Sequence, residues 1–483
     1  MSYIGVKPKT AYDSVRKDRF TSTTGTTVTL SYAVSSVNDI LVWVNGVKQD
    51  YTNYSVSSTT LTLGGTLVSS DIVEVAYLGR TYGSVVPNDA SVGTSALQDD
   101  AVTTAKINDG AVTSGKIASG VVPSLRPNAK PLIINGNCAV SQRGTSATDE
   151  SSGGYYRVDR MYFAISSMGE GRLQQESLTS GNAFDNGFRN AWRVDCAVAD
   201  ASPAASDYMY LQYNLEGQDL QVFKKGTSNA EKFTLAFWVK SSKTGTGNIQ
   251  LKDKDNSNRQ CTQSYTISSA NTWEHKVCVF GADTTGAFDD DNGKSLNINW
   301  WLDSGSNYDS GTANHGTWEA QDNTKVNAGG TLNIQDNTAN DWAITGIQLE
   351  VGEYTSSTLP PFQHESYGDN LARCQRYYLN YVEGSNKMLG IAASYNSNEV
   401  VVMHNFPTTM RTAPTLEINT GSNYYSHGED GNVESVTGSN VSIDRAMLNG
   451  TQLLFTSMSS NSGDGGIMYT NNSSSKISYT AEL

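Results

Sequence analysis

The chain has 483 residues, enough for about three domains, and 37% of them are hydrophobic. With 44 Gly, 25 Tyr and only 10 Pro, the composition favours β-structure with many turns. A formal net charge of −14 argues against a nucleic-acid-binding protein, and no stretch approaches the ~18 consecutive apolar residues of a membrane helix. No secretion signal is expected from the first residues.

Residues 1–86 are predicted to form a small β-domain. Apolar and polar residues alternate over 28–32, which indicates a half-buried strand. Ile40–Val44 is apolar on both faces, so we expect it at the centre of a sheet, and Asn45-Gly46 directly after it predicts a tight hairpin. Further strands are expected at Leu61–Leu63 and Ile72–Leu78.

Residues 87–125 carry an apolar residue at every fifth position. Five helical residues turn the chain through about 500°, so successive apolar residues would lie about 140° apart. Five strand residues would reverse the face at each step. Several identical chains wound about one axis could bury every fifth residue together, and we therefore predict an intertwined trimeric repeat stalk. The alternative is a flexible linker rich in Ala, Thr, Asp and Gly. The series is Val92, Leu97, Val102, Ile107, Val112, Ile117 and Val122.

Residues 130–368 contain short strands separated by loops of Gly, Ser, Asn and Asp, the pattern of a β-sandwich. Residues 369–385 are predicted to be a short helical connector, capped by Asp369 and bearing Leu371, Cys374 and Tyr378 on one side. Residues 386–483 return to short strands with few charges, and we predict a C-terminal β-sandwich tip. The whole fold class is expected to be all-β.

Five cysteines are widely spaced and odd in number, without a CxxC pair. We expect reduced thiols in or near a core rather than disulfides. They are Cys138, Cys196, Cys261, Cys278 and Cys374.

Aromatic and polar residues supply what sugar recognition needs, namely flat apolar faces with hydrogen-bonding groups around them. Neighbours in a strand face opposite sides, so one of Trp300 and Trp301 is expected in the core while the other looks out. Core packing is the competing role for each tryptophan, and stacking within the trimer for the two tyrosines. The candidate carbohydrate- or receptor-binding residues are Trp300, Trp301, Trp318, Tyr424, Tyr425 and His427.

Catalysis has little support in the sequence. Asp289–Asp291 with Asp253 and Asp255 offer paired carboxylates for glycoside cleavage, but acidic loop residues are usually solvated. No zinc-binding HExxH, GxSxG nucleophile motif or phosphate-binding loop is present. We therefore expect no catalytic residues, no resident metal site and no cofactor. Calcium binding by loop aspartates stays open, although no EF-hand pattern occurs.

Several motifs resemble bacteriophage tail fibres, and the resemblance covers most of the chain. The "VNGV" hairpin at Val44–Val47 resembles their N-terminal domain, and the Ala-Val-Thr-Thr-Ala-Lys-Ile repeat resembles their stalks. The central block is similar to their jelly-roll domain, which itself resembles carbohydrate-binding modules. The residues that carry this similarity are Ile134–Asn137, Ser141–Arg143, Tyr156–Tyr162, Leu235–Lys240, Trp273, Ile344–Glu350, Phe362–Tyr367 and Cys374–Tyr378, with Phe406–Pro414 in the last domain.

The resemblance implies a homotrimeric structural protein of the virion, assembled in the cytoplasm of the bacterial host. Its N-terminal domain would attach to a phage tail adaptor or nozzle protein. Its central and C-terminal β-domains would bind a host cell-surface polysaccharide or outer-membrane receptor. One alternative is a tailspike glycoside hydrolase, which usually needs a long β-helix or an obvious catalytic pair. Another is a cellular adhesin, which normally needs a signal peptide.

Overall fold

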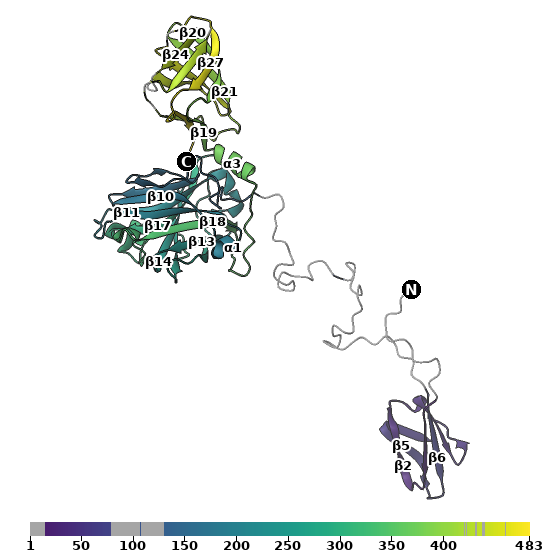
Figure 1. Cartoon of the computed structure of the whole chain (residues 1–483). Coiled ribbons are helices and arrows are strands. Elements are labelled where there is room, and N and C mark those ends of the chain that lie inside the picture. Colours follow the sequence, from purple (N-terminus) through teal and green to yellow (C-terminus); the bar gives the residue numbers. More distant parts are fainter. Residues whose placement is uncertain are drawn as a thin grey trace. The chain divides into compact units, whose positions relative to one another are not determined.

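The computed structural model describes residues 15–78, 107 and 130–483, apart from 420, 422, 430–431, 437–439 and 459. The chain is all-β and divides into two compact units, Met1–Thr113 and Ser114–Leu483 (Figure 1). Within the described ranges, no helix is long and apolar enough to cross a membrane.

The N-terminal domain pairs a four-stranded sheet, in the order β1-β6-β3-β4, with the two-stranded sheet β2-β5 around one apolar core. Strand β3 lies between two neighbours, as its two apolar faces predicted. Asn45 and Gly46 have φ values of 50° and 80°, as a type I′ hairpin turn requires, and Val44 faces Val47 across it. The elements are β1 (Lys17–Thr21), β2 (Gly25–Val34), η1 (Val37–Asp39), β3 (Ile40–Val44), β4 (Val47–Lys48), β5 (Tyr54–Leu67) and β6 (Ile72–Tyr77).

The predicted stalk falls almost entirely outside the described residues. Ile107 is the exception, and its side chain is exposed in the single chain. An exposed apolar residue is compatible with burial between chains and with a linker, so the stalk stays a prediction. The positions outside are Val92, Leu97, Val102, Val112, Ile117 and Val122.

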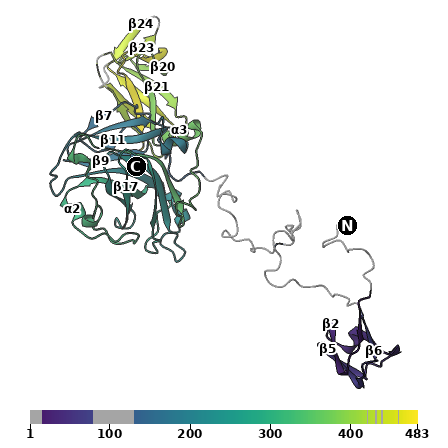
Figure 2. The same cartoon turned by 60° about the horizontal axis from the view of Figure 1, so that its bottom comes forward.

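The central domain is a sandwich of two antiparallel six-stranded sheets (Figures 1 and 2). Sheet I has the order β16-β13-β18-β11-β10-β7, and sheet II has the order β15-β14-β17-β12-β9-β8. The pairs β8–β9, β10–β11 and β14–β15 are consecutive in the sequence, whereas most other neighbours are separated by strands of the opposite sheet, as in a jelly-roll. Sheet I comprises β7 (Thr148–Glu150), β10 (Glu170–Ser177), β11 (Asn190–Val198), β13 (Phe233–Ser241), β16 (Glu274–Phe280) and β18 (Asp341–Val351). Sheet II comprises β8 (Gly154–Tyr155), β9 (Met161–Ser166), β12 (Tyr208–Glu216), β14 (Gly245–Asp253), β15 (Gln260–Ile267) and β17 (Lys294–Ser304). Short helices lie between them: α1 (Asn182–Asp185), η5 (Gly217–Asp219), η6 (Gln221–Phe223), α2 (Ser306–Asp309), η7 (Asn323–Lys325) and η8 (Ile334–Asp336).

Helix α3 (Tyr367–Gln375) follows the sandwich, but its cap differs from the prediction. The Ser366 hydroxyl accepts from the Asp369 amide at 3.1 Å, so Ser366 is the N-cap and Asp369 stands in the first turn, where its charge suits the helix dipole. Cys374 is buried as expected, while Tyr378 has already left the helix and begins the next strand.

The C-terminal domain packs a seven-stranded sheet, β24-β23-β27-β20-β21-β26-β25, on the three-stranded sheet β19-β28-β22. Its elements are β19 (Tyr378–Glu383), β20 (Met388–Asn396), β21 (Glu399–Asn405), β22 (Thr415–Ile418), β23 (Tyr425–Glu429), β24 (Asn432–Val436), β25 (Val441–Ala446), β26 (Gly450–Thr456), β27 (Gly465–Thr470) and β28 (Lys476–Thr480).

All five cysteines are free and buried, which confirms the prediction of reduced thiols in or near a core. They are Cys138, Cys196, Cys261, Cys278 and Cys374.

Buried ion pairs join the C-terminal domain to the sandwich. Arg160, only 1% exposed, lies 2.6 Å from Glu482, and Arg143 contacts the same carboxylate at 3.3 Å. Arg376 donates to both carboxylate oxygens of Glu216, at 2.9 and 2.7 Å. Truncating one partner would leave a buried charge uncompensated, so these pairs fix the two domains to each other.

Candidate functional site

The face of sheet II that points away from the sandwich core carries amide and aromatic side chains along the middle of its strands, several of them covered and at most 4% exposed. In β12 the residues 209, 211, 213 and 215 point into the core, so 208, 210 and 212 point outward. In β17 the same alternation buries Trp300 and turns Asn299 and Trp301 to the outward face. The register places these outward residues of the two strands beside each other.

Four aromatic rings cluster at one end of this face. Tyr210 packs on Trp301 with ring centroids 4.7 Å apart, and Tyr208 stacks on Tyr210 at 5.4 Å. Tyr308, from α2, lies 5.3 Å from Trp301. The three tyrosines are half-buried and Trp301 is 4% exposed, so Trp301 supports the cluster while the tyrosine rings reach solvent.

A directional ladder of carboxamides runs beside the rings and crosses four strands. Each side-chain nitrogen donates to the next side-chain oxygen at 2.9 Å, from Gln212 to Asn299, from Asn299 to Gln250 and from Gln250 to Gln260. Gln260 ends the ladder by donating to the Asp322 carbonyl at 3.0 Å. The Gln212 carboxamide oxygen, at the half-exposed start, receives no hydrogen bond from any residue that the structure describes.

We call these eight residues the aromatic–amide face: Tyr208, Tyr210, Trp301, Tyr308, Gln212, Asn299, Gln250 and Gln260. None carries a formal charge at neutral pH. Burial raises the pKa of Tyr210 above its ordinary value, so its hydroxyl stays protonated and able to donate. At the end of β17, burial raises the pKa of Asp303 to about 6. Ring faces beside hydrogen-bonding amides can hold a polar, uncharged ligand that also has apolar CH surfaces.

Of the predicted tryptophans, only Trp301 belongs to this face. Trp300 is fully buried in the sandwich core, where it meets Phe237 edge-on at 6.0 Å. Trp318 is 8% exposed, and its indole Nε1 donates to the Gly281 carbonyl at 2.8 Å. The assignment of Trp300 and Trp318 as ligand contacts is therefore wrong, because the sandwich core covers both rings.

The predicted tip residues are also mostly internal. Tyr425 is fully buried, and its hydroxyl contacts the carbonyls of Asn419 and Lys476 at 3.1 and 2.8 Å. His427 is fully buried on the same strand, while Tyr424 is half-buried. Tyr425 and His427 thus stabilise the C-terminal core, which corrects their assignment as receptor contacts.

The acidic residues weighed as a catalytic pair do not form one open site. Asp253 is fully buried against Lys225, 2.5 Å from its ammonium nitrogen, whereas Asp289–Asp291 lie at the exposed loop surface. Asp255 accepts a hydrogen bond from the Asp289 amide at 3.0 Å. In the parts of the chain that the structure describes, no three His, Cys, Asp or Glu side chains group to hold a metal ion.

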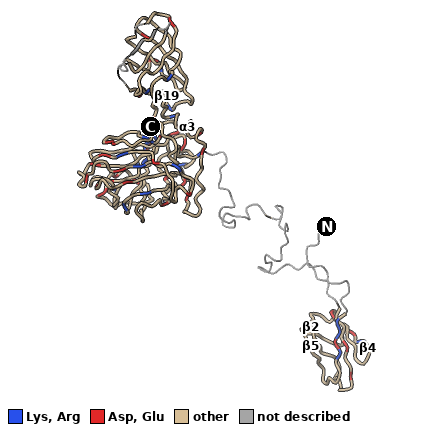
Figure 3. Tube along the Cα trace, viewed as in Figure 1, with Lys and Arg blue, Asp and Glu red and all other residues tan. Residues whose placement is uncertain are grey.

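A second open surface lies on the seven-stranded C-terminal sheet. Ile391 pairs with Ile467, Ile467 with Gly428 and Gly428 with Val433, which puts these positions in one line across four strands. Ile391 is 76% exposed, and Met403 on the neighbouring strand β21 is 66% exposed. We call Val433, Ile467, Ile391 and Met403 the aliphatic row. The residues around this row are mostly uncharged (Figure 3).

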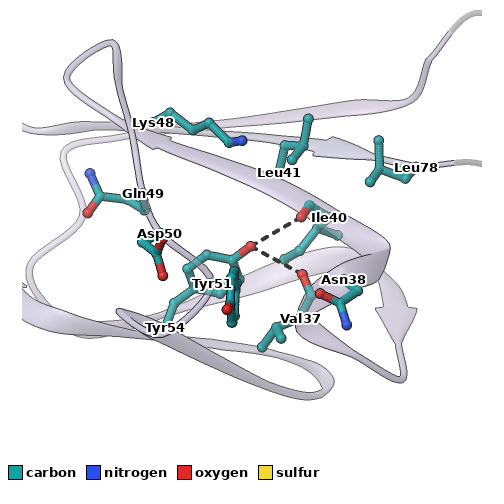
Figure 4. Close-up of a pocket in the computed structure, with 10 residues that line it drawn as sticks. All are labelled: Val37, Asn38, Ile40, Leu41, Lys48, Gln49, Asp50, Tyr51, Tyr54 and Leu78. Atoms are coloured by element: carbon teal, nitrogen blue, oxygen red, sulfur yellow. Dashed lines mark hydrogen bonds between the residues drawn. The ribbon is translucent and has the colours of Figure 1, made fainter.

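The N-terminal domain holds a hollow of about 360 Å³ between β3 and the loop before β5. Figure 4 shows the Tyr54 hydroxyl at its base, 3.1 Å from each of the carbonyl oxygens of Val37 and Ile40. Tyr51, on the rim, is well exposed. The hollow therefore joins a fixed polar base to an accessible aromatic rim.

Sequence reasoning missed most of the aromatic–amide face, although a signal was present. The segment Tyr208–Leu215 alternates Tyr, Gln and Asn with Met, Leu and Tyr, which is the pattern of a strand with one core face and one face of polar and aromatic residues. The segment 297–301 repeats the pattern with Asn and Trp. Two such strands, taken together, predict a shared amide and aromatic surface.

The sequence matches no family model and no curated protein. Among solved structures, the enzymatically active domain of bacteriophage CBA120 tailspike protein 4 is 12% identical with a TM-score of 0.23, over 46% of this chain and 21% of that chain. A putative sugar-binding protein from Bacteroides thetaiotaomicron is 12% identical with a TM-score of 0.22, over 46% of this chain and 100% of that one. The C-terminal family 22 carbohydrate-binding module from Clostridium thermocellum is 12% identical with a TM-score of 0.22, over 44% of this chain and 99% of that one. The fold assignment rests on the sheets themselves.

Proposed function

We propose that this protein is a homotrimeric, non-enzymatic tail fibre of a bacteriophage virion that binds a neutral host-surface glycan on the aromatic–amide face. The observation that carries the glycan proposal is the juxtaposition of three half-exposed tyrosine rings with an ordered carboxamide ladder. The tyrosine rings would accept the CH face of a sugar, and Gln212, the accessible member of the ladder, would meet its hydroxyl groups. Asn299, Gln250 and Gln260 are at most 2% exposed and hold Gln212 in place from below. The ladder is already hydrogen-bonded before a ligand arrives, so little ordering entropy opposes binding.

Two independent features support the homotrimer. The apolar residue at every fifth position between 92 and 122 would be covered if identical chains wound about one axis. The aliphatic row leaves Ile391 and Met403 with 76% and 66% of their surface in water, which a second copy of this chain would cover. Because the row is uncharged, two copies would not repel each other there despite the net charge of −14.

The N-terminal domain, with its hollow of about 360 Å³, is the proposed attachment to a tail adaptor or nozzle protein. The virion would then be assembled in the host cytoplasm, as the five reduced thiols favour. A variant lacking residues 1–86 should still coat host cells but should not enter particles. Its incorporation into virions would overturn this orientation.

The direct test of the glycan proposal compares two tyrosines. Tyr210→Ala should weaken binding to purified host polysaccharide by about 5- to 20-fold, because it removes one stacking surface and one hydroxyl. Tyr395→Ala, on the C-terminal sheet and 73% exposed, is the matched control and should bind like the unmodified protein. Equal binding by all three proteins would refute the site.

The same samples separate a binding fibre from a tailspike hydrolase. The polysaccharide is incubated with the protein, and its chain length is measured by size-exclusion chromatography. An unchanged length together with saturable binding is the expected result. Shortened chains would make the protein an enzyme.

A further inference from the structure

Among the residues that the structure describes, Lys225 is the one lysine that is buried, and 1% of its side chain is exposed. It follows η6, and its ammonium enters a cluster formed by two loops, 253–259 and 281–289. Four oxygens surround the nitrogen: Asp253 Oδ2 at 2.5 Å, Asp283 Oδ2 at 3.1 Å, and the carbonyls of Thr285 and Gly286 at 2.9 and 2.7 Å. Two carboxylates and two carbonyls are also the ligand types that calcium prefers.

The oxygens are held in place by contacts that do not involve Lys225. Asp253 accepts from the backbone amides of Asp255 and Asn256 at 2.9 and 3.1 Å. Both oxygens of Asp283 accept from Arg259 at 3.1 Å. The cage is thus built by the loops and filled by the ammonium.

The loop that supplies the carbonyl oxygens depends on a glycine. Gly286 has φ +70°, and a Cβ there would lie 2.0 Å from the Asn256 side-chain oxygen. Asn256 in turn donates to Asp253 at 2.9 Å. The backbone conformation that aims the Gly286 carbonyl at the cation therefore requires this residue type.

We propose that the Lys225 ammonium takes the place of a divalent cation in this loop cluster. The ion is supplied by the chain itself, so these loops keep their structure without calcium. Removing the ammonium while leaving its space open would create a calcium site from Asp253, Asp283 and the two carbonyls, with water completing the coordination. Replacing the lysine with an uncharged side chain that fills the space would not create this site.

Two substitutions separate these effects. Lys225→Ala opens the space, whereas Lys225→Met fills it with an uncharged chain of similar length. Without calcium, both should lower the melting temperature by about 5–10 °C, because two carboxylates lose a buried cation. About 1 mM calcium should restore most of the loss in Lys225→Ala and little in Lys225→Met. The unmodified protein should melt at the same temperature in calcium and in chelator.

Terbium luminescence gives a direct readout, because the Trp318 ring centre lies 5.4 Å from the position of the ammonium nitrogen. Excitation of tryptophan should sensitise terbium bound to Lys225→Ala several-fold more strongly than terbium added to the unmodified protein or to Lys225→Met, and calcium should quench the signal. Adding Asp283→Asn to Lys225→Ala should abolish the gain.

If Lys225→Ala does not fold in chelator, its refolding and that of Lys225→Ser in calcium decide the matter. Soluble protein that appears only with calcium supports the proposal. Failure of both variants to fold in calcium would overturn it, as would equal terbium signals from Lys225→Ala and Lys225→Met. The proposal would also be overturned if calcium raised the melting temperature of the unmodified protein and of Lys225→Met alike. Calcium would then stabilise the protein at a place other than these loops.

Discussion

Two surfaces of this protein reach solvent, a group of tyrosine rings on sheet II and a row of aliphatic side chains on the C-terminal sheet, and their chemistry differs. The aromatic–amide face of sheet II links its carboxamides to one another from Gln212 to Gln260 and leaves three tyrosine rings partly exposed. The aliphatic row of the C-terminal sheet shows Ile, Met and Val, with Ile391 76% exposed. A sugar can use the first surface, because it offers both stacking and hydrogen bonds. The second offers neither, but it suits a protein surface that excludes water.

The largest expected effect comes from placing charge on the aliphatic row. Ile391→Glu with Met403→Glu should abolish self-association through this face, because each contact would lose about 1.5–3 kcal/mol of apolar burial and would also bury a carboxylate. Analytical ultracentrifugation should show a shift to smaller species, while the affinity for glycan per chain stays unchanged. If this double variant sedimented like the unmodified protein but bound glycan more weakly, the aliphatic row would be a glycan-binding surface and not a contact between chains.

Next in size is a pH effect at the end of the first face. Burial raises the pKa of Asp303 to about 6, from 3.8. Between pH 3.8 and about pH 6 the Asp303 carboxyl is ionised in the unfolded chain and protonated in the folded chain. Its contribution to the free energy of unfolding is therefore complete below pH 4 and is lost as the pH rises to about 6. The loss amounts to about 3 kcal/mol.

Asp303→Asn removes this titration. Urea unfolding followed by tryptophan fluorescence should show the variant gaining stability relative to the unmodified protein between pH 4 and pH 6. A constant difference across this range would contradict the buried protonated carboxyl. Asp18→Asn, in the N-terminal domain, is a control that should leave the transition of the central domain unchanged.

The middle and the start of the carboxamide ladder should differ by a smaller amount. Gln250→Ala, in the middle, leaves Asn299 and Gln260 without their ladder partner and should lower stability by about 1–3 kcal/mol. Gln212→Ala, at the start, should cost little stability but weaken glycan binding by about 3- to 10-fold. Equal losses of stability would mean that the ladder is purely structural along its whole length.

The smallest expected effect is that of salt. The aromatic–amide face carries no formal charge, so raising the ionic strength should change glycan affinity by less than about twofold. A steep fall of glycan affinity between low and moderate salt would show that charged residues outside this face contact the receptor.

Local sequence determined which segments are strands and where some of them turn. The apolar and polar alternation over 28–32 placed β2, and the Asn45-Gly46 pair predicted a turn whose two residues have positive φ. The alternation also required Trp300 and Trp301 to lie on opposite faces. These features depend on the strand repeat and on backbone preferences, which act over a few residues.

Tertiary structure decided the rest. Only sheet packing shows that Trp300 faces inward and that Trp318 and Tyr425 are covered. The ladder joins Gln212 to Asn299, which are 87 positions apart, and the Lys225 cage draws on three separate segments. Strand alternation separates the two faces of a strand, but it does not say which of these faces another sheet will cover. That choice depends on the strand order and on partners supplied by distant parts of the chain.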